Sequence, residues 1–144
     1  MRNLAVLLAV VGLASIGGSI WAYCHDRSLA DPVYLASQIQ FEPDPVQLGD
    51  LAQNDPRTIE VRITNHLPVP MTVLGANSGC DQHACLAVET SLPFTIGAGE
   101  TAKYSFKYLS RIVGPLRDEH DIYTDAGTFH LQLRGLVAAA PSPA

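Results

Sequence analysis

Two cysteines with a histidine between them form the segment whose residue types most favour chemistry. Cys80 and Cys85 are separated by four residues, and His83 is one of those four. In an oxidising compartment such a pair closes a local disulfide, worth about 2 kcal/mol in the chain-entropy model. Two thiolates and an imidazole are also ligands for copper(I) or zinc, with Asp81 as the nearest fourth donor. We favour a disulfide between Cys80 and Cys85, and keep a metal site (Cys80, His83, Cys85) and thiol exchange as alternatives.

A second group of titratable residues surrounds His120. Asp118, Glu119 and Asp121 flank this histidine and offer oxygen ligands to a cation. Four consecutive polar residues are, however, more typical of a solvated loop, which is the interpretation we favour. His130 falls on the polar side of a predicted strand and is interpreted as a solvated surface residue.

The sequence lacks the motifs of common catalytic sites. No serine lies in a Gly-x-Ser-x-Gly elbow, and no histidine–carboxylate pair can be matched to a nucleophile. Gly97 and Gly99 are close together, but no helical pattern follows them that would direct amides at a phosphate group. We therefore predict that the chain is not an enzyme and uses no cofactor.

A long loop is predicted at residues 109–119. Its apolar residues are flanked by arginines, a combination that protein interfaces favour. The candidate interaction residues are Arg111, Ile112, Val113, Leu116 and Arg117. In the alternative interpretation, which we weigh somewhat higher, these apolar side chains fold back and cover one end of the domain.

Alternating apolar and polar residues predict the strands that would position these side chains. Ile59, Val61 and Ile63 alternate with polar residues, the period of a strand with one buried and one solvated face. The same alternation occurs at residues 103–108 and 129–134. Weaker strand candidates lie at 71–74, 86–89 and 121–124. Because turn signals separate these segments and helical periodicity is absent after the N-terminal run, we predict an all-β, immunoglobulin-like β-sandwich of about seven strands.

An uncharged apolar run at residues 4–23, preceded by Arg2, predicts a membrane-spanning or signal helix. A helix of this length is about 30 Å long, the thickness of the hydrocarbon core of a bilayer. Since the apolar character continues through Trp21 and Tyr23, we favour an uncleaved single-pass anchor over a signal cleaved after Ala22. The predicted location is the inner membrane with the domain in the periplasm or extracellular space, or export as a soluble protein after cleavage.

The predicted domain organisation has four parts. They are the anchor or signal segment 1–24, a linker 25–38, the β-sandwich 39–137 and a disordered tail 138–144. Cys24 is the odd thiol, at the membrane edge. The 144-residue chain carries a formal net charge of -5 and no basic cluster, which argues against nucleic acid as a partner. The remaining partners are the membrane, through the N-terminal helix, and an unidentified protein.

Short motifs follow one another along the predicted sandwich in a family-like order. They are Asn65, Ser78-Gly79-Cys80, Ile-Gly-Ala-Gly-Glu at 96–100, Gly114, Tyr123-Thr124-Asp125 and Leu-Arg-Gly-Leu-Val at 133–137. This order resembles the bacterial domain of unknown function 1573, an immunoglobulin-like family related to major sperm protein domains. The sequence differs from the family pattern at the cysteines. The family often has Ser-Cys-Gly-Cys-Thr, whereas four residues separate Cys80 and Cys85 here. The family has no established enzymatic activity, so the resemblance implies the fold more than the function.

Together these observations predict a membrane-anchored, non-catalytic, extracytoplasmic immunoglobulin-like module for protein interaction or scaffolding. The alternative is a small copper- or zinc-binding protein that uses the loop with Cys80, His83 and Cys85.

Overall fold

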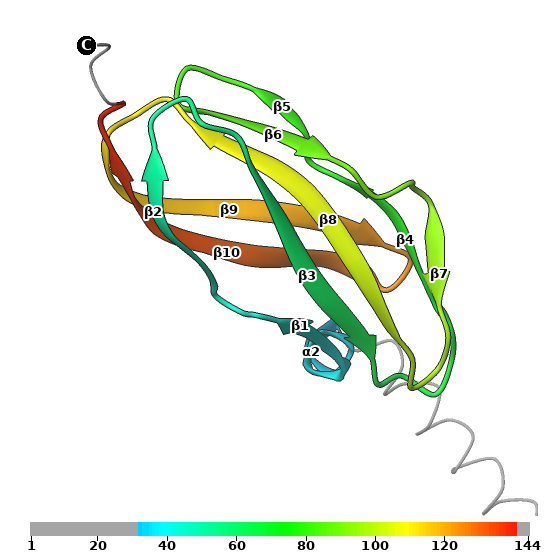
Figure 1. The fold of residues 1–144 in the computed structure, drawn as a ribbon. Helices are drawn as coiled ribbons and strands as arrows, with labels where there is room; N and C mark the ends of the chain where they lie inside the picture. Colours follow the sequence, from blue (N-terminus) through cyan, green and yellow to red (C-terminus); the bar gives the residue numbers. More distant parts are fainter. Residues whose placement is uncertain (1–31, 141–144) are drawn as a thin grey trace, which may run out of the picture. The chain divides into compact units, whose positions relative to one another are not determined.

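The computed structural model describes residues 32–140 (Figure 1). Within these residues a short helix, α2 (Pro32–Gln38), precedes ten strands. The strands are β1 (Ile39–Glu42), β2 (Val46–Ala52), β3 (Arg57–Asn65), β4 (Met71–Ala76), β5 (Gly79–Cys80), β6 (Ala84–Val88), β7 (Phe94–Ile96), β8 (Thr101–Ser110), β9 (Gly114–Thr124) and β10 (Gly127–Ala138). The predicted N-terminal anchor or signal helix and Cys24 lie outside the described residues, and α2 occupies the end of the predicted linker. Among the described residues no helix has the length and apolarity needed to cross a membrane.

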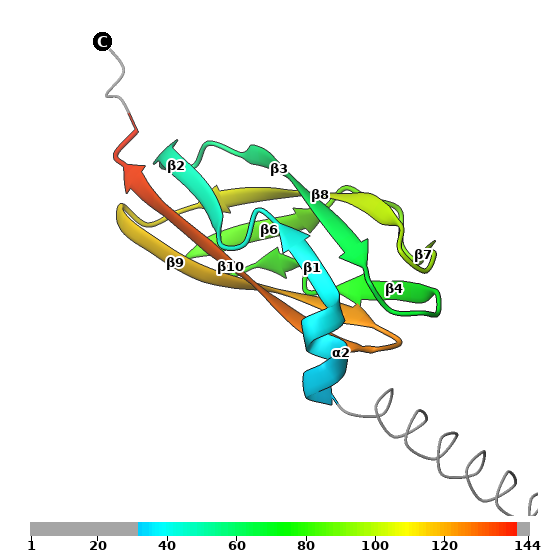
Figure 2. The ribbon, with the colours of Figure 1, turned by 90° about the horizontal axis from the view of Figure 1, so that it is seen from below.

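The strands form two five-stranded sheets that pack face to face. The first sheet has the order β1-β3-β8-β6-β5 and the second β2-β10-β9-β4-β7. All neighbouring strands are antiparallel except β2 and β10, which run parallel. β3 and β8 of the first sheet cross in front of β9 and β10 of the second in Figure 1, and Figure 2 shows the domain turned by 90°. The predicted all-β, immunoglobulin-like sandwich is thus confirmed, and strands of two to four residues raise the number of strands above the predicted seven.

The core consists of the apolar residues that alternation assigned to the inner faces. Ile59, Val61 and Ile63 of β3 are buried, while the residues between them are exposed. The same holds for the inner faces of β8 and β10, which contribute Tyr104, Phe106, Tyr108, Phe129, Leu131 and Leu133. Removing this apolar area from water is the main driving force for the fold.

The prediction of a long loop at residues 109–119 is wrong. β8 and β9 are long strands, and only residues 111–113 connect them. The inner face of β9 carries polar residues, among them Asp118 and buried His120, so the apolar alternation that reveals other strands is broken here. Tertiary pairing with β10 over eleven register positions holds this segment as a strand.

A change of sheet after β4 leaves one side of β9 open. β4 pairs with the C-terminal end of β9, at residues 122–124, and its chain then crosses to the first sheet as β5. Residues 77–78 make this crossing. Within the described part of the chain, residues 114–119 of β9 therefore pair with β10 on one side and with no strand on the other.

Candidate functional site

The hairpin formed by β5 and β6 contains the predicted disulfide. Cys80 and Cys85 are directly opposite each other in the antiparallel register, and their Sγ atoms are bonded at 2.09 Å. The disulfide interpretation of this pair is confirmed. With the two sulfurs joined, neither is a thiolate ligand, so the metal site of Cys80, His83 and Cys85 remains a prediction for the reduced chain.

The turn of this hairpin is organised by Asp81. Its Oδ1 accepts the backbone N–H of His83 at 2.7 Å and of Ala84 at 2.8 Å, while its own N–H donates to the carbonyl of Ala84. The backbone N–H groups of Ala84 and His83 hold the pKa of the exposed Asp81 carboxyl below its usual value. The imidazole of His83 is exposed at the tip of the turn.

Arg111 joins the two regions that the sequence singled out separately. Its backbone N–H donates to the carbonyl of His83 at 2.7 Å. Its guanidinium donates to the carbonyl of Asp81 at 2.9 Å and to Sγ of Cys85 at 3.3 Å. No sequence pattern indicates these contacts, because 26 to 30 positions separate the partners. Arg111 thus supports the disulfide hairpin.

The other predicted interaction residues lie around the start of β9. Ile112 and Val113 are about half exposed, at 48% and 49%. Leu116 is partly buried on the inner side of β9, and Arg117 is exposed on the outer side. The two interpretations of this segment therefore apply to different residues: Leu116 folds inward, whereas Ile112 and Val113 face solvent.

A groove separates the disulfide hairpin from the open side of β9. It consists of two adjoining hollows of about 290 Å³ and about 330 Å³. Both are lined by Asp81, Ala84, Tyr108 and Asp118. We call this feature the interlayer groove; the first hollow reaches Cys80 and the second reaches Ile112 and Leu116.

The hydroxyl of Tyr108 is fixed within this groove. It donates to Oδ2 of Asp118 at 2.7 Å, and Oδ1 of the same carboxylate accepts the N–H of Glu119 at 2.8 Å. Burial, followed by the contact with Asp118, raises the pKa of the Tyr108 phenol above its usual value. The phenol is therefore a neutral hydrogen-bond donor, and Asp118 is engaged inside the groove.

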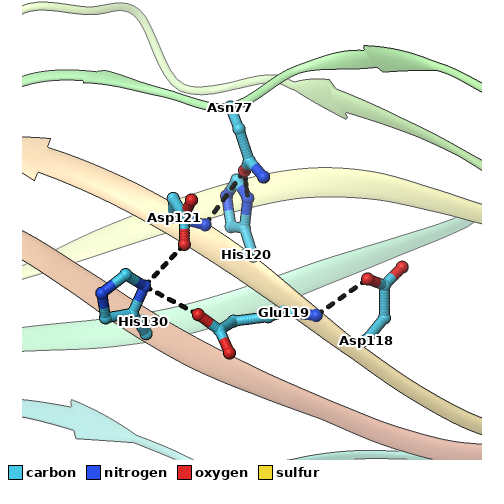
Figure 3. A network of polar contacts seen from close by, with 6 residues as sticks. All are labelled: Asn77, Asp118, Glu119, His120, Asp121 and His130. Atoms are coloured by element: carbon cyan, nitrogen blue, oxygen red, sulfur yellow. Dashed lines mark hydrogen bonds and ion pairs between the residues drawn. The ribbon is translucent and has the colours of Figure 1, made fainter.

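The polar residues around His120, interpreted from the sequence as a solvated loop and alternatively as a cation site, belong to strand β9 and are divided between the two faces of the sheet (Figure 3). His120 is fully buried, and its ring lies 4.5 Å from that of Phe106, centroid to centroid. Glu119 and Asp121 occupy the outer face instead, because successive residues of a strand point to opposite sides. His120 and these two carboxylates do not form one site.

Buried His120 is neutral and fully hydrogen-bonded. Oδ1 of Asn77 accepts the N–H of Asp121 at 3.0 Å and lies 2.5 Å from Nδ1 of His120. Since this oxygen only accepts, Nδ1 carries the proton, and Nε2 accepts the hydroxyl of Tyr104 at 2.7 Å. Burial lowers the pKa of His120 to about 4 and raises that of Tyr104.

The outer face of β9 and β10 carries a different cluster that sequence reasoning missed. Nδ1 of His130 lies 2.7 Å from a carboxylate oxygen of Glu119 and 2.7 Å from one of Asp121 (Figure 3). The contact with Asp121, followed by that with Glu119, raises the pKa of His130. One signal in the sequence could have indicated this cluster. If residues 114–124 are taken as a strand, alternate side chains place Glu119 and Asp121 on the same face of the sheet as His130. One ligand atom from each residue lies within 4.8 Å of the others, but all three residues are accessible and already satisfy one another.

Comparison with known proteins identifies the fold but no family. No sequence profile of a protein family matches the chain, and no curated protein matches it. The PapD-like domain 7 of human CEP192 superposes with a TM-score of 0.54 and 14% identity over 77% of this chain and 90% of that domain. The secreted serine protease VesC from Vibrio cholerae superposes with a TM-score of 0.55 and 15% identity over 72% of this chain. WR4, a major sperm protein family member from C. elegans, gives a TM-score of 0.46 at 13% identity over 70% of this chain and 98% of that protein.

These similarities concern a domain-sized unit. This chain spans only 24% of the VesC chain but most of the CEP192 domain. At 14–15% identity they show a shared PapD-like, immunoglobulin-like fold and nothing about activity. Membership in the domain of unknown function 1573 family remains a prediction.

Proposed function

We propose that this chain is a non-catalytic interaction module that binds an extended segment of a partner protein along the open side of β9. The observation that carries the proposal is the interlayer groove beside residues 114–119, whose backbone lacks a neighbouring strand within the described part of the chain. An added strand at this position would extend the second sheet by main-chain hydrogen bonds, while alternate side chains provide specificity.

The backbone of β9 offers a short, defined set of hydrogen-bonding groups. Asp121 directs its N–H and C=O away from β10, toward Asn77. By the two-residue period of a strand, Pro115, Arg117 and Glu119 face the same open side. Proline has no N–H, and the N–H of Glu119 is taken by Asp118. The N–H and C=O of Arg117 are therefore the central pair available to a partner strand.

The side chains favour a partner with alternating apolar and acidic residues. Arg117 is directly opposite Arg134 on β10, and neither contacts a carboxylate among the described residues. Two like charges in register are unfavourable, and an acidic side chain beside them would relieve the repulsion. On the inner side, the apolar atoms of Tyr108, Leu116 and Ile112 line the groove and suit an apolar side chain.

A peptide selection on the full-length chain in detergent micelles tests this proposal. Short random peptides are selected, and hydrogen exchange then locates the binders. We expect the selected peptides to alternate apolar and acidic residues, and to slow exchange of the Arg117 amide. Peptides that protect other strands, or that lack acidic residues, would contradict the proposal.

Two substitutions of Arg117 separate the contribution of its backbone N–H to binding from the contribution of its charge. Arg117→Ala removes the charge alone and is expected to weaken binding up to about five-fold, as for an exposed ion pair. Arg117→Pro also removes the N–H on the open side, without touching the ladder to β10, and is expected to weaken binding at least ten-fold. Lys103→Ala, on the first sheet, is the control and should bind normally. Equal binding by the wild type and Arg117→Pro would overturn the proposal.

We also propose that the module is tethered to a membrane on its extracytoplasmic side. The support is the apolar run at residues 4–23 and the disulfide, since disulfides persist in oxidising compartments. The intact mass of the native protein reports whether the segment is retained. Protease added to cells whose outer envelope has been opened but whose inner membrane is intact should then digest the domain, and resistance that persists until the inner membrane is lysed would refute this location.

A further inference from the structure

We infer that the disulfide of the β5–β6 hairpin is a thiol–disulfide exchange site, at which an external thiol attacks Cys80 and Cys85 is the leaving group. This inference concerns covalent chemistry at the hairpin and does not depend on strand addition at β9. It rests on the different surroundings of the two sulfurs and on the contact between Arg111 and Cys85.

The two cysteines differ in accessibility. Cys80 is exposed and lines the interlayer groove, whereas Cys85 is partly buried and does not line it. Exchange requires the attacking thiolate to reach one sulfur of the disulfide, so access selects which sulfur is attacked. The groove provides that approach to Cys80.

The two cysteines also differ in charge environment. The guanidinium of Arg111 donates to Sγ of Cys85 at 3.3 Å, and no cationic group contacts Cys80 among residues 32–140. A neighbouring arginine stabilises a thiolate and makes it a better leaving group. Two backbone carbonyls, of Asp81 and His83, hold Arg111 in this position, so the cation is in place before any bond breaks.

The exchange step is balanced and needs no oxidant. The sulfur of the incoming thiolate forms a bond to Sγ of Cys80, the bond between Cys80 and Cys85 breaks, and its electron pair leaves with Cys85 as a thiolate beside Arg111. The product is a mixed disulfide between Cys80 and the external thiol. Attack of the Cys85 thiolate on Cys80 expels that thiol again and restores the original bond.

The hairpin can open without dismantling the sheets. β6 pairs with β8 at five positions, and the N–H of Arg111 donates to the carbonyl of His83, and neither contact involves the bond between the two sulfurs. The two cysteines therefore remain neighbours after the attack, which favours the return step over reaction with a second external thiol. The site would hold a thiol-bearing partner covalently and reversibly.

Mapping of glutathione adducts tests the inference in the full-length chain carrying Cys24→Ser. Reduced glutathione is added at millimolar concentration, the reaction is quenched with acid, and peptide mass spectrometry locates the adduct. We expect the adduct on Cys80. An adduct mainly on Cys85, equal adducts on both, or a disulfide that stays intact would overturn the inference.

Arg111→Gln tests the leaving-group role, because glutamine retains a neutral donor for the carbonyl of Asp81. If the leaving group has a Brønsted slope of about 0.5, a thiol pKa change of about one unit slows attack about three-fold. Arg62→Ala, which removes an exposed arginine from β3, should leave the rate unchanged. An unchanged rate in Arg111→Gln would overturn the inference.

A second measurement remains informative if Arg111→Gln folds poorly. In a chain with Cys24→Ser and Cys80→Ser, the pH dependence of alkylation reports the pKa of the Cys85 thiol. We expect this pKa below the usual value of about 8.5, and a value at or above that would overturn the inference.

A peptide with one cysteine serves as a second attacking thiol beside glutathione. Faster attack by the peptide indicates that the thiol belongs to a protein partner, and equal rates indicate a small thiol.

Discussion

At the scale of single residues, the burial of His120 distinguishes this domain most clearly from what its sequence suggests. A histidine next to three acidic residues suggests a solvated polar cluster. Its ring is instead buried, packs against Phe106 and hydrogen-bonds with Tyr104 and Asn77. With the ring neutral, Nε2 accepts the hydroxyl of Tyr104, whereas a proton on Nε2 would make this nitrogen a donor and leave the buried Tyr104 O–H without its acceptor. The native state therefore opposes protonation of this histidine.

The first prediction is a loss of stability in mild acid. The pKa of His120 is about 4 in the folded chain, below the ordinary 6.5, so the unfolded chain takes up a proton that the folded chain refuses. The contribution of neutral His120 to the free energy of unfolding is fully present above pH 6.5 and is lost as the pH falls toward 4. Between pH 7.5 and pH 5 this costs about 2 kcal/mol of unfolding free energy. Urea denaturation of the wild type and of His120→Gln at the two pH values measures it, because His130, whose pKa is raised, contributes with the opposite sign in both chains.

His120→Gln provides the comparison for this acid sensitivity. This variant should be less stable than the wild type at pH 7.5, because the packing of the ring is lost. Its free energy of unfolding should, however, fall less than that of the wild type between pH 7.5 and pH 5. Gln132→Ala, which replaces an exposed residue of β10 that does not titrate, should keep the wild-type pH dependence. If His120→Gln retains the full loss between the two pH values, the acid sensitivity arises elsewhere.

At the scale of elements, sequence reasoning worked where one strand face is apolar throughout. The middle parts of the inner faces of β3, β8 and β10 were predicted because every second residue there is apolar, whereas the buried polar residues Asn65 and Ser110 at the ends of β3 and β8 were not. β9 was missed in part because Asp118 and His120 occupy inner positions, where hydrogen bonds to residues of other strands compensate their polarity. The groove could not be predicted, since it arises from the crossing of the chain between sheets after β4, a tertiary event without a local signal.

The second prediction concerns Asn77, which stabilises that crossing. Its Oδ1 serves both His120 and the N–H of Asp121, and its own N–H donates to the carbonyl of Asp121. Asn77→Ala leaves two donors without their acceptor and should lower the free energy of unfolding by about 2 kcal/mol. Thermal and urea denaturation measure this loss. Ser78→Ala, at the adjacent exposed position, should change stability by less than about 0.5 kcal/mol, and equal effects would contradict the role assigned to Asn77.

The third prediction concerns Gly135, where β2 and β10 approach closely. A Cβ atom here would lie 2.9 Å from the carbonyl oxygen of Gly49 and 3.2 Å from Cβ of Leu48, beside the register shift of this parallel pair. Because a backbone atom must move, Gly135→Ala should destabilise the domain by about 1–3 kcal/mol. Hydrogen exchange should show the loss first in β2. Gln132→Ala, on the exposed face of β10, is the control, and a neutral Gly135→Ala would show that β2 shifts freely.

At the scale of the whole molecule, the candidate sites are peripheral to the structure that carries the stability. The core lies between β3 and β8 on one side and β9 and β10 on the other, whereas the disulfide closes a ring between residues five positions apart in an edge hairpin. A short ring removes little entropy from the unfolded chain, so the bond adds only about 2 kcal/mol. The fold thus permits chemistry at this disulfide without unfolding.

The fourth prediction follows from this separation of stability and chemistry. The chain with Cys80→Ser and Cys85→Ser should lose about 2 kcal/mol of unfolding free energy yet retain the β-type circular dichroism and a cooperative transition. β6 remains paired with β8, and Arg111 still contacts the turn through His83, so hydrogen exchange should rise only in β5 and the turn. The wild type under reducing conditions should behave in the same way, which separates loss of the bond from the serine substitutions. Unfolding of either form would mean that the hairpin is required by the core, and reversible exchange at Cys80 would then be impossible in a folded protein.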